Sequence, residues 1–444
     1  MLENLDLPLI FSRTQEAGYS YCHLYAERTA TTEFEIRDKE NNSRHYESGG
    51  LCIELKRDNE SISHTFRTNS FSTNEILNLI GLHEISFNPP LPRKPPQPKN
   101  SSLGSKLQKL NLLVRKINLE NSLTEPVSFW FQEKIQEYQS AVHPDEIKSG
   151  ITEQGEIKIE VNSSHKGKPL FFSHHFSTGR LEELWGELEK LLPQIQRRIQ
   201  LGSTEQWPAP MGAIPMGWSA HSVAKLVDCF LRGFESDLVL KNFSYLNRLQ
   251  FPLNFRFSIR EKTPPLKQET DHQGSIRRAM LIFDGNRPNG LATDKLTAQE
   301  LNVSSTGHSR RESFDVPSTI SFWHPVLESS HTTDCVLALM SEGLWVEEVE
   351  IKEWDLSTGM ATLHFSQVNL VHQGEIGESV RPFLWTVSLL DIMSRMTHFS
   401  KETLTTGIFH TKLKQRILTE YTTSAALASP LEIPGSVPKS HYWG

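Results

Sequence analysis

Hydrophobic and polar positions alternate along residues 19–68 in a way that predicts strands. Apolar side chains recur at every second position in three successive runs, and a period of two is typical of a strand with one buried face. Turn-forming sequences, DKENN at 38–42 and SGG at 48–50, separate the runs. The N-terminal part is therefore a predicted β-meander, whose apolar positions include Tyr21, Tyr25, Phe34, Ile36, Leu51, Ile53 and Leu55.

Apolar residues at spacings of three and four predict helices further along the chain. The clearest amphipathic pattern lies at 179–201. Ser72 or Thr73 is a suitable N-cap for another helix, predicted at 73–82. Helices are predicted at 73–82, 127–141, 179–201, 219–232 and 383–397.

The remaining apolar runs are shorter and predict strands. Three short strands are expected near 148–176, and a strand with a turn at 209–217. After residue 250 strands dominate, with runs at 252–260, 278–284, 333–340, 343–350 and 360–372.

A proline-rich stretch interrupts this pattern. Residues 88–105 contain six prolines, which favour an extended, semi-rigid connector over a packed element. It is an excursion within a predicted N-terminal α/β domain, 1–205, that precedes a predicted strand-rich C-terminal domain, 206–444. The predicted fold class is α+β, with an N-terminal β-meander and helices followed by the strand-rich domain.

Composition excludes several classes of protein. The 444 residues carry a net charge of −7, from 53 acidic and 46 basic side chains, so a protein built mainly to neutralise nucleic-acid phosphates is not expected. The four cysteines form no CxxC pair, and neither a secretory signal nor an apolar run of about 18 residues is present. We therefore expect a cytoplasmic protein with reduced thiols and no membrane contact.

The predicted helix at 219–232 carries a candidate metal ligand, His221. A zinc peptidase helix needs two histidines and a glutamate that activates the bound water. Here Ser222 follows the histidine, and Leu226 stands five residues after it. A lone histidine on a helix is more often a packed or solvated side chain than a ligand.

Other candidate sites are weaker. Gly217–His221 (GWSAH) nearly fits a serine-hydrolase nucleophile elbow, but His221 replaces the small residue that the elbow needs. Residues 304–314 (SSTGHSRRESF) contain His308, Arg310, Arg311 and Glu312. Such a segment could grip a peptide carboxylate or backbone, or it could be a surface loop with salt-bridged arginines.

Four stretches together resemble the TldD/PmbA family, also called the modulator-of-DNA-gyrase or U62 peptidase family. They are the opening meander from 17 to 54, the helix at 219–232 with the run before it, the segment 305–313 (STGHSRRES), and the C-terminal pieces 343–346 (GLWV), 357–359 (STG) and 374–377 (GEIG). In this order they span the chain from about residue 15 to residue 400.

The resemblance implies a chain of the PmbA/TldE-like branch, which lacks the metal motif. In the TldD branch this helix carries HExxxH, and a cysteine near the C-terminus completes the zinc site. Here His221 matches the first histidine, Ser222 replaces the glutamate, Leu226 replaces the second histidine, and no cysteine follows Cys335. A single imidazole does not retain zinc, because affinity comes from the combined ligand set.

The expected function is therefore that of a metal-free, non-catalytic subunit of a heterodimeric zinc metallopeptidase. Its partner would be a TldD-like subunit that holds the zinc and cuts unfolded peptides or a peptide precursor, including leader removal from natural products. His221, His308, Arg310, Arg311 and Glu312 would contact an extended peptide. Two alternatives stay open: a metal-independent hydrolase that uses His221, His308 or Ser219, and a stand-alone peptide-binding module.

Overall fold

The structure is a computed structural model, and it describes residues 1–37, 40–57, 60–66, 72–79, 108, 112, 128–165, 168–184, 186–187, 213–262 and 269–432. The proline-rich excursion 88–105 and most of the predicted helix 179–201 lie outside these residues. No helix within the described ranges is long and apolar enough to cross a membrane.

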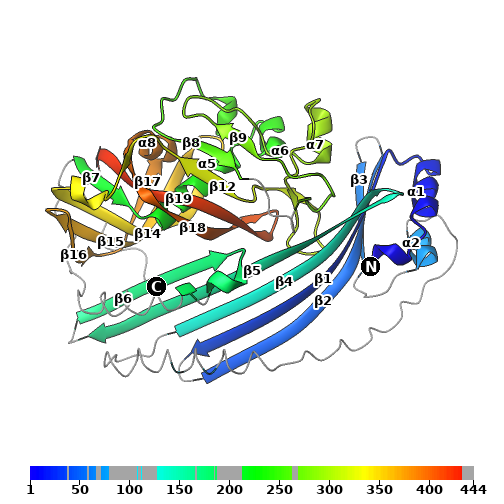
Figure 1. The fold of residues 1–444 in the computed structure, drawn as a ribbon, viewed down its shortest axis with the longest axis horizontal. Helices are drawn as coiled ribbons and strands as arrows, with labels where there is room; N and C mark the ends of the chain where they lie inside the picture. Colours follow the sequence, from blue (N-terminus) through cyan, green and yellow to red (C-terminus); the bar gives the residue numbers. More distant parts are fainter. Residues whose placement is uncertain are drawn as a thin grey trace.

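Residues up to 178 build one antiparallel sheet in the order β3-β2-β1-β4-β5-β6. Figure 1 shows its long curved strands passing beneath the C-terminal body, with α1 and α2 at one end. The elements are η1 (Leu2–Asn4), α1 (Leu7–Glu16), β1 (Tyr21–Arg37), β2 (Glu40–Arg57), β3 (Glu60–Phe66), α2 (Thr73–Leu79), β4 (Ser128–His143), β5 (Glu146–His165) and β6 (Lys168–Thr178).

Residues from 213 onward form a body around an 11-stranded sheet whose main path is β16-β15-β14-β7-β19-β12-β8-β9. Its strands are β7 (Ala213–Trp218), β8 (Ser258–Glu261), β9 (Met280–Phe283), β12 (Pro325–Glu328), β13 (Thr332–Thr333), β14 (Glu342–Asp355), β15 (Met360–His372), β16 (Glu375–Val380), β17 (Phe383–Ser388), β18 (Met396–Lys412) and β19 (Gln415–Glu432). A separate two-stranded ladder joins β10 (Ser309–Arg310) to β11 (Thr319–Ile320).

The helical elements of this body are α5 (Ala220–Arg232), α6 (Ser236–Leu240), η2 (Tyr245–Asn247), α7 (Lys295–Glu300), η4 (Leu337–Leu339) and α8 (Leu389–Ser394). Helix α5 follows β7 directly and packs against β14, β18 and β19. Its apolar residues, among them Leu226 and Phe230, enter the main hydrophobic core together with Phe283 and Phe365. This packing fixes the helix whose chemistry is in question.

The structure confirms the α+β fold class and several predicted elements. The meander is β1 to β3, the helix at 219–232 is α5, the helix at 73–82 is α2, and 360–372 is β15. The division at residue 205 stays a prediction.

Some predicted elements were wrong. The helix predicted at 127–141 is strand β4, and both of its faces are partly covered: Phe129 and Phe131 are buried on one face and Tyr138 on the other. Apolar residues on both faces of a strand imitate helical spacing. The three short strands near 148–176 are the two long strands β5 and β6. The helix predicted at 383–397 is β17 followed by the short α8, and 333–340 contains η4 instead of a strand.

Gly307 lies close to the backbone of a neighbouring segment, which allows a stability test of this fold. Gly307 has φ +75°, and a Cβ there would lie 2.6 Å from the carbonyl oxygen of Ile276. We expect Gly307→Ala to lower the free energy of unfolding by at least about 1–3 kcal/mol, measured by urea denaturation. Gly377→Ala is the control, because a Cβ there meets only the Leu370 carbonyl oxygen at 3.5 Å. Equal stability of the two variants would contradict this account.

Candidate functional site

The start of α5 is tied to β14 by two serine hydroxyls. Ser219 caps the helix by accepting the Ser222 N–H at 3.1 Å, and it donates to the carbonyl oxygen of Glu347 at 2.7 Å. Ser222 donates to the same carbonyl at 3.0 Å and is fully buried. The position that would carry a catalytic glutamate therefore holds a short, buried side chain that is hydrogen-bonded to β14.

His221 is engaged by two neighbours. Its Nδ1 lies 3.1 Å from Oγ1 of Thr406 on β18, and its Nε2 lies 3.4 Å from Oε2 of Glu348 on β14. Burial lowers the pKa of His221, so its neutral form is favoured. Lys225, one turn further along α5, also makes an ion pair with Glu348.

Glu348 is a buried carboxylate that stays ionised. Burial alone would raise its pKa, but the positive charge of Lys225, and after it the nearby His221, outweigh burial and hold the pKa of Glu348 well below its usual range. A buried carboxylate requires such partners.

A zinc ion does not fit the residues present on this helix. Leu226, where a second ligand would stand, is fully buried in the hydrophobic core, and it has no lone pair to offer. Within the described part of the chain, no three His, Cys, Asp or Glu side chains are grouped so that they could hold a metal ion.

A cavity of about 510 Å³ lies beside α5. Its walls are the helix, the second half of β14 and the residues of β18 from 407 to 411, and His175 of the N-terminal sheet closes part of it. Its lining includes Lys225, Asp228, Cys229, Arg232, Glu350, Ile351, Lys352, Trp354, Phe409 and His410.

Two lining residues belong to a chain of contacts with the connectivity of a serine-hydrolase triad. Asp228 Oδ1 lies 3.1 Å from Nδ1 of His410, and Nε2 of His410 lies 3.2 Å from Oγ of Ser321. Ser321, however, has 0% of its surface exposed, and it does not line the cavity. A nucleophile must reach the substrate carbonyl, so we interpret these residues as a buried polar network.

The arginines of the segment 304–314 connect the two sheets. Arg311 is fully buried and forms an ion pair with Glu54 of β2 at 2.7 Å, while its guanidinium lies over the Tyr25 ring. Glu54 also accepts from His23 at 2.9 Å. We call Arg311, Glu54 and His23 the intersheet brace.

The neighbouring candidates have internal partners too. Arg310 donates to the carbonyl oxygen of Phe322 at 2.7 Å and stacks on Trp323. Glu312 accepts the Arg416 N–H at 2.7 Å. Lys134 of β4 donates to the Glu312 carbonyl at 2.7 Å.

His308 is 1% exposed, and its Nε2 lies 3.6 Å from Glu261. Burial and internal pairing of these candidates favour a structural role. Their contact with a peptide stays a prediction.

The structure does not gather all predicted site residues in one place. His221 lies on α5 against β14 and β18, whereas Arg311 and Glu312 lie where the C-terminal body meets the N-terminal sheet. Sequence reasoning missed Lys225 and Glu348. Lys225 stands four residues after His221, hence on the same side of the helix, but Glu348 gives no local signal because it is 123 residues from Lys225.

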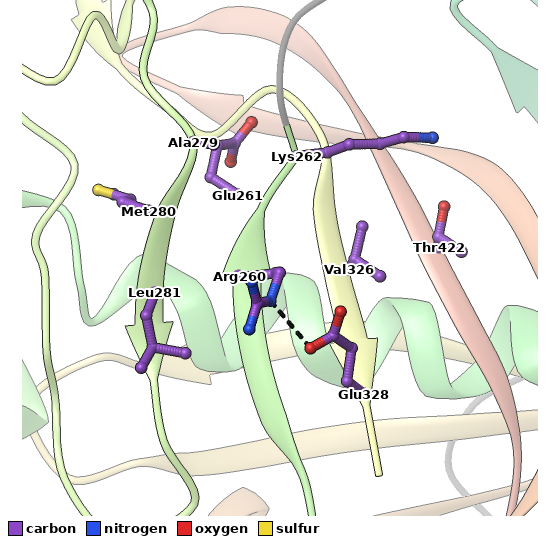
Figure 2. Close-up of a pocket in the computed structure, with 9 residues that line it drawn as sticks. All are labelled: Arg260, Glu261, Lys262, Ala279, Met280, Leu281, Val326, Glu328 and Thr422. Atoms are coloured by element: carbon purple, nitrogen blue, oxygen red, sulfur yellow. Dashed lines mark hydrogen bonds and ion pairs between the residues drawn. The ribbon is translucent and has the colours of Figure 1, made fainter.

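A second cavity, of about 420 Å³, lies on the sheet formed by β9, β8, β12 and β19. Figure 2 shows Arg260 reaching Glu328, beside Leu281, Val326 and Thr422. The Arg260–Glu328 pair, at 2.9 Å, is about half exposed. We find no nucleophile or metal-ligand set among its lining residues, so it is not a candidate active site.

Fold and site together define a two-sheet α+β protein with the helix of a metallopeptidase and without its ligand set. Residues 212–424 match the family model of the PmbA/TldA metallopeptidase C-terminal domain. This match of the C-terminal part supports the TldD/PmbA family, as the sequence predicted. A search of curated proteins finds no significant match.

Solved structures share the fold over nearly the whole chain. TldE from Thermococcus kodakarensis is 13% identical, with a TM-score of 0.74 over 97% of this chain and 100% of that one. A candidate modulator of DNA gyrase from Thermotoga maritima is 13% identical, with a TM-score of 0.72 over 96% and 98%. A third, from Bacteroides thetaiotaomicron, is 14% identical, with a TM-score of 0.65 over 95% and 98%.

The intersheet brace gives a mutational test. We expect Arg311→Met to lower the free energy of unfolding by about 3–5 kcal/mol, because it leaves the buried Glu54 carboxylate unpaired. Arg260→Met, which breaks a half-exposed pair, should cost less than about 1 kcal/mol. Urea denaturation of both variants checks this, and a similar small loss in each would argue against a brace.

The same brace predicts a pH dependence. Burial alone would raise the pKa of Glu54, but the opposite effects of Arg311 and then His23 are larger. They lower the pKa to about 2, from a usual 4.5. A carboxyl group whose pKa is lower in the folded than in the unfolded protein stabilises the fold at pH values above its unfolded pKa. For Glu54 this stabilisation, roughly 3 kcal/mol, is lost as the pH falls from 4.5 to 2. The stability difference between wild type and Glu54→Gln, measured by urea denaturation, should therefore shrink as pH falls from 5 to 2. A constant difference would contradict this linkage.

Proposed function

We propose that this chain is the metal-free subunit of a heterodimeric TldD/TldE-type zinc metallopeptidase. The observation that carries the proposal is the state of α5: Ser222 is buried and bonded to β14, Leu226 is in the core, and His221 contacts Glu348 and Thr406. Zinc would be held by a TldD-like partner in the cytoplasm, and this chain would take no part in the zinc chemistry.

The fold supports the subunit role. The likeness to TldE of Thermococcus kodakarensis extends over the whole of that chain, so the two share their fold. The loss is confined to side chains. A chain that keeps the fold and loses the ligands is suited to completing an assembly around a partner that has them.

The substrate of the assembly would be an extended peptide, either unfolded or a precursor with a leader to be removed. The 510 Å³ cavity beside α5 has the size of a ligand pocket. Its lining mixes paired charges with apolar side chains such as Ile351 and Phe409.

The contacts found favour this proposal over a metal-independent hydrolase. Ser219 is committed as the helix cap, and Ser321 is fully buried. His308 is buried as well. Neither serine is placed to meet a substrate carbonyl.

Zinc content and reconstitution test the proposal. We expect the purified full chain to contain far less than one zinc per molecule by elemental analysis and to show no chelator-sensitive peptidase activity. Co-expression with a TldD-like chain that carries HExxxH, taken from the same genome, should yield a one-to-one complex with chelator-sensitive cleavage of an unfolded peptide.

The control is the same complex in which the motif glutamate of the TldD-like chain is changed to glutamine. It should assemble normally but not cleave. Stoichiometric zinc in this chain alone, together with chelator-sensitive cleavage, would overturn the proposal, and so would failure to form the complex.

A further inference from the structure

Three side chains from two elements meet at the edge of the cavity beside α5. His221 and Lys225 come from the helix and Glu348 from β14, and their side chains are 13%, 11% and 7% exposed. The Lys225 ammonium makes an ion pair with Oε1 of Glu348, while Nε2 of His221 lies 3.4 Å from Oε2. We call these three residues the Lys225 cluster.

Two members of the Lys225 cluster have donor atoms that suit a divalent ion. A carboxylate oxygen and a neutral imidazole nitrogen are both zinc ligands. Nδ1 of His221 lies 3.1 Å from the Thr406 hydroxyl, a partner that holds the orientation of the ring. Nε2 is buried and lies 3.4 Å from Oε2 of Glu348.

The third member supplies a positive charge at the same place. A buried carboxylate is stable only if its charge is compensated. The Lys225 ammonium is the group in ion-pair contact with Oε1 of Glu348, so the compensation comes from Lys225. The ammonium is tethered by its own side chain, which gives it a high effective concentration at the carboxylate compared with a dissolved ion.

We propose that the Lys225 ammonium is a built-in cation that replaces a metal ion at this position and keeps divalent ions away from Glu348 and His221. This inference rests on the proposed function, because it explains how the metal-free helix stays folded. Lys225 would then be a physical reason, besides the missing ligands, why the side chains of α5 do not fit a zinc ion.

The cavity makes the idea testable. Lys225 lines it, so a neutral side chain at this position would leave the Glu348 carboxylate without its cation next to the cavity. Water molecules could complete the coordination of an ion held by two protein ligands. Removal of the ammonium should therefore create a weak metal site without any added ligand.

The experiment compares wild type with Lys225→Met in the full chain, using ZnCl2 as the probe. Without metal, Lys225→Met should unfold at a lower temperature, because Glu348 has lost its partner. Zn²⁺ should raise the melting temperature of Lys225→Met by several degrees and leave that of wild type unchanged. Calorimetric titration should show at least about tenfold tighter zinc binding by the variant.

Three further variants control for unspecific effects. Lys225→Met combined with His221→Ala, or with Glu348→Gln, should lose the zinc response, because each removes a ligand. Lys352→Met removes another lysine that lines the same cavity, one paired with Glu350, and it should create no zinc response. Bound Co²⁺ should give visible d–d absorption in Lys225→Met only.

Several outcomes would overturn the inference. One is zinc binding by wild type as tight as by Lys225→Met, and another is a folded Lys225→Met that does not bind zinc. Failure of Lys225→Met to fold even with Zn²⁺ counts equally against it, because a divalent ion should replace the ammonium. The proposed function fails separately, through stoichiometric zinc in wild type or the absence of a complex.

Discussion

A buried carboxylate that stays ionised is stabilised by a cation beside it, and this constraint acts at two places in the structure. Where the two sheets meet, Glu54 of β2 is paired with Arg311, which belongs to the C-terminal body. The pair joins residues more than 250 positions apart in the sequence. Because breaking it leaves a charge in a low-dielectric interior, the N-terminal sheet is held in one place on the body.

The same constraint acts at the start of α5. In a zinc peptidase the positive charge at this helix comes from the ion. Here Glu348 is compensated by Lys225 of the helix itself, while the apolar side of α5, including Leu226 and Phe230, packs into the main core. The charge of Glu348 and the apolar side of α5 therefore both have partners within the chain.

The sequence predicted what depends on local patterns. The spacing of the apolar residues was sufficient to predict α5, and the order of short motifs was sufficient to predict the family. It failed for β4, because Phe131 and Tyr138 are buried on opposite faces of one strand and their spacing also fits a helix. A central strand covered on both faces loses the alternation that identifies strands.

The candidate site was less predictable for a different reason. From the sequence, Arg310 and Arg311 could grip a peptide carboxylate or belong to a surface loop with salt-bridged arginines. The carboxylate that Arg311 pairs with is Glu54, and Arg310 stacks on Trp323.

Such partners are set by tertiary contacts, which single-sequence spacing does not encode, and Glu348 was missed on the same grounds. Before an arginine or lysine in a peptidase-like fold is assigned to substrate binding, a carboxylate partner within the same chain has to be excluded. In this chain that test turns from the arginine pair to Lys225, a charged residue of α5 that lines the cavity and forms an ion pair with the buried carboxylate of Glu348.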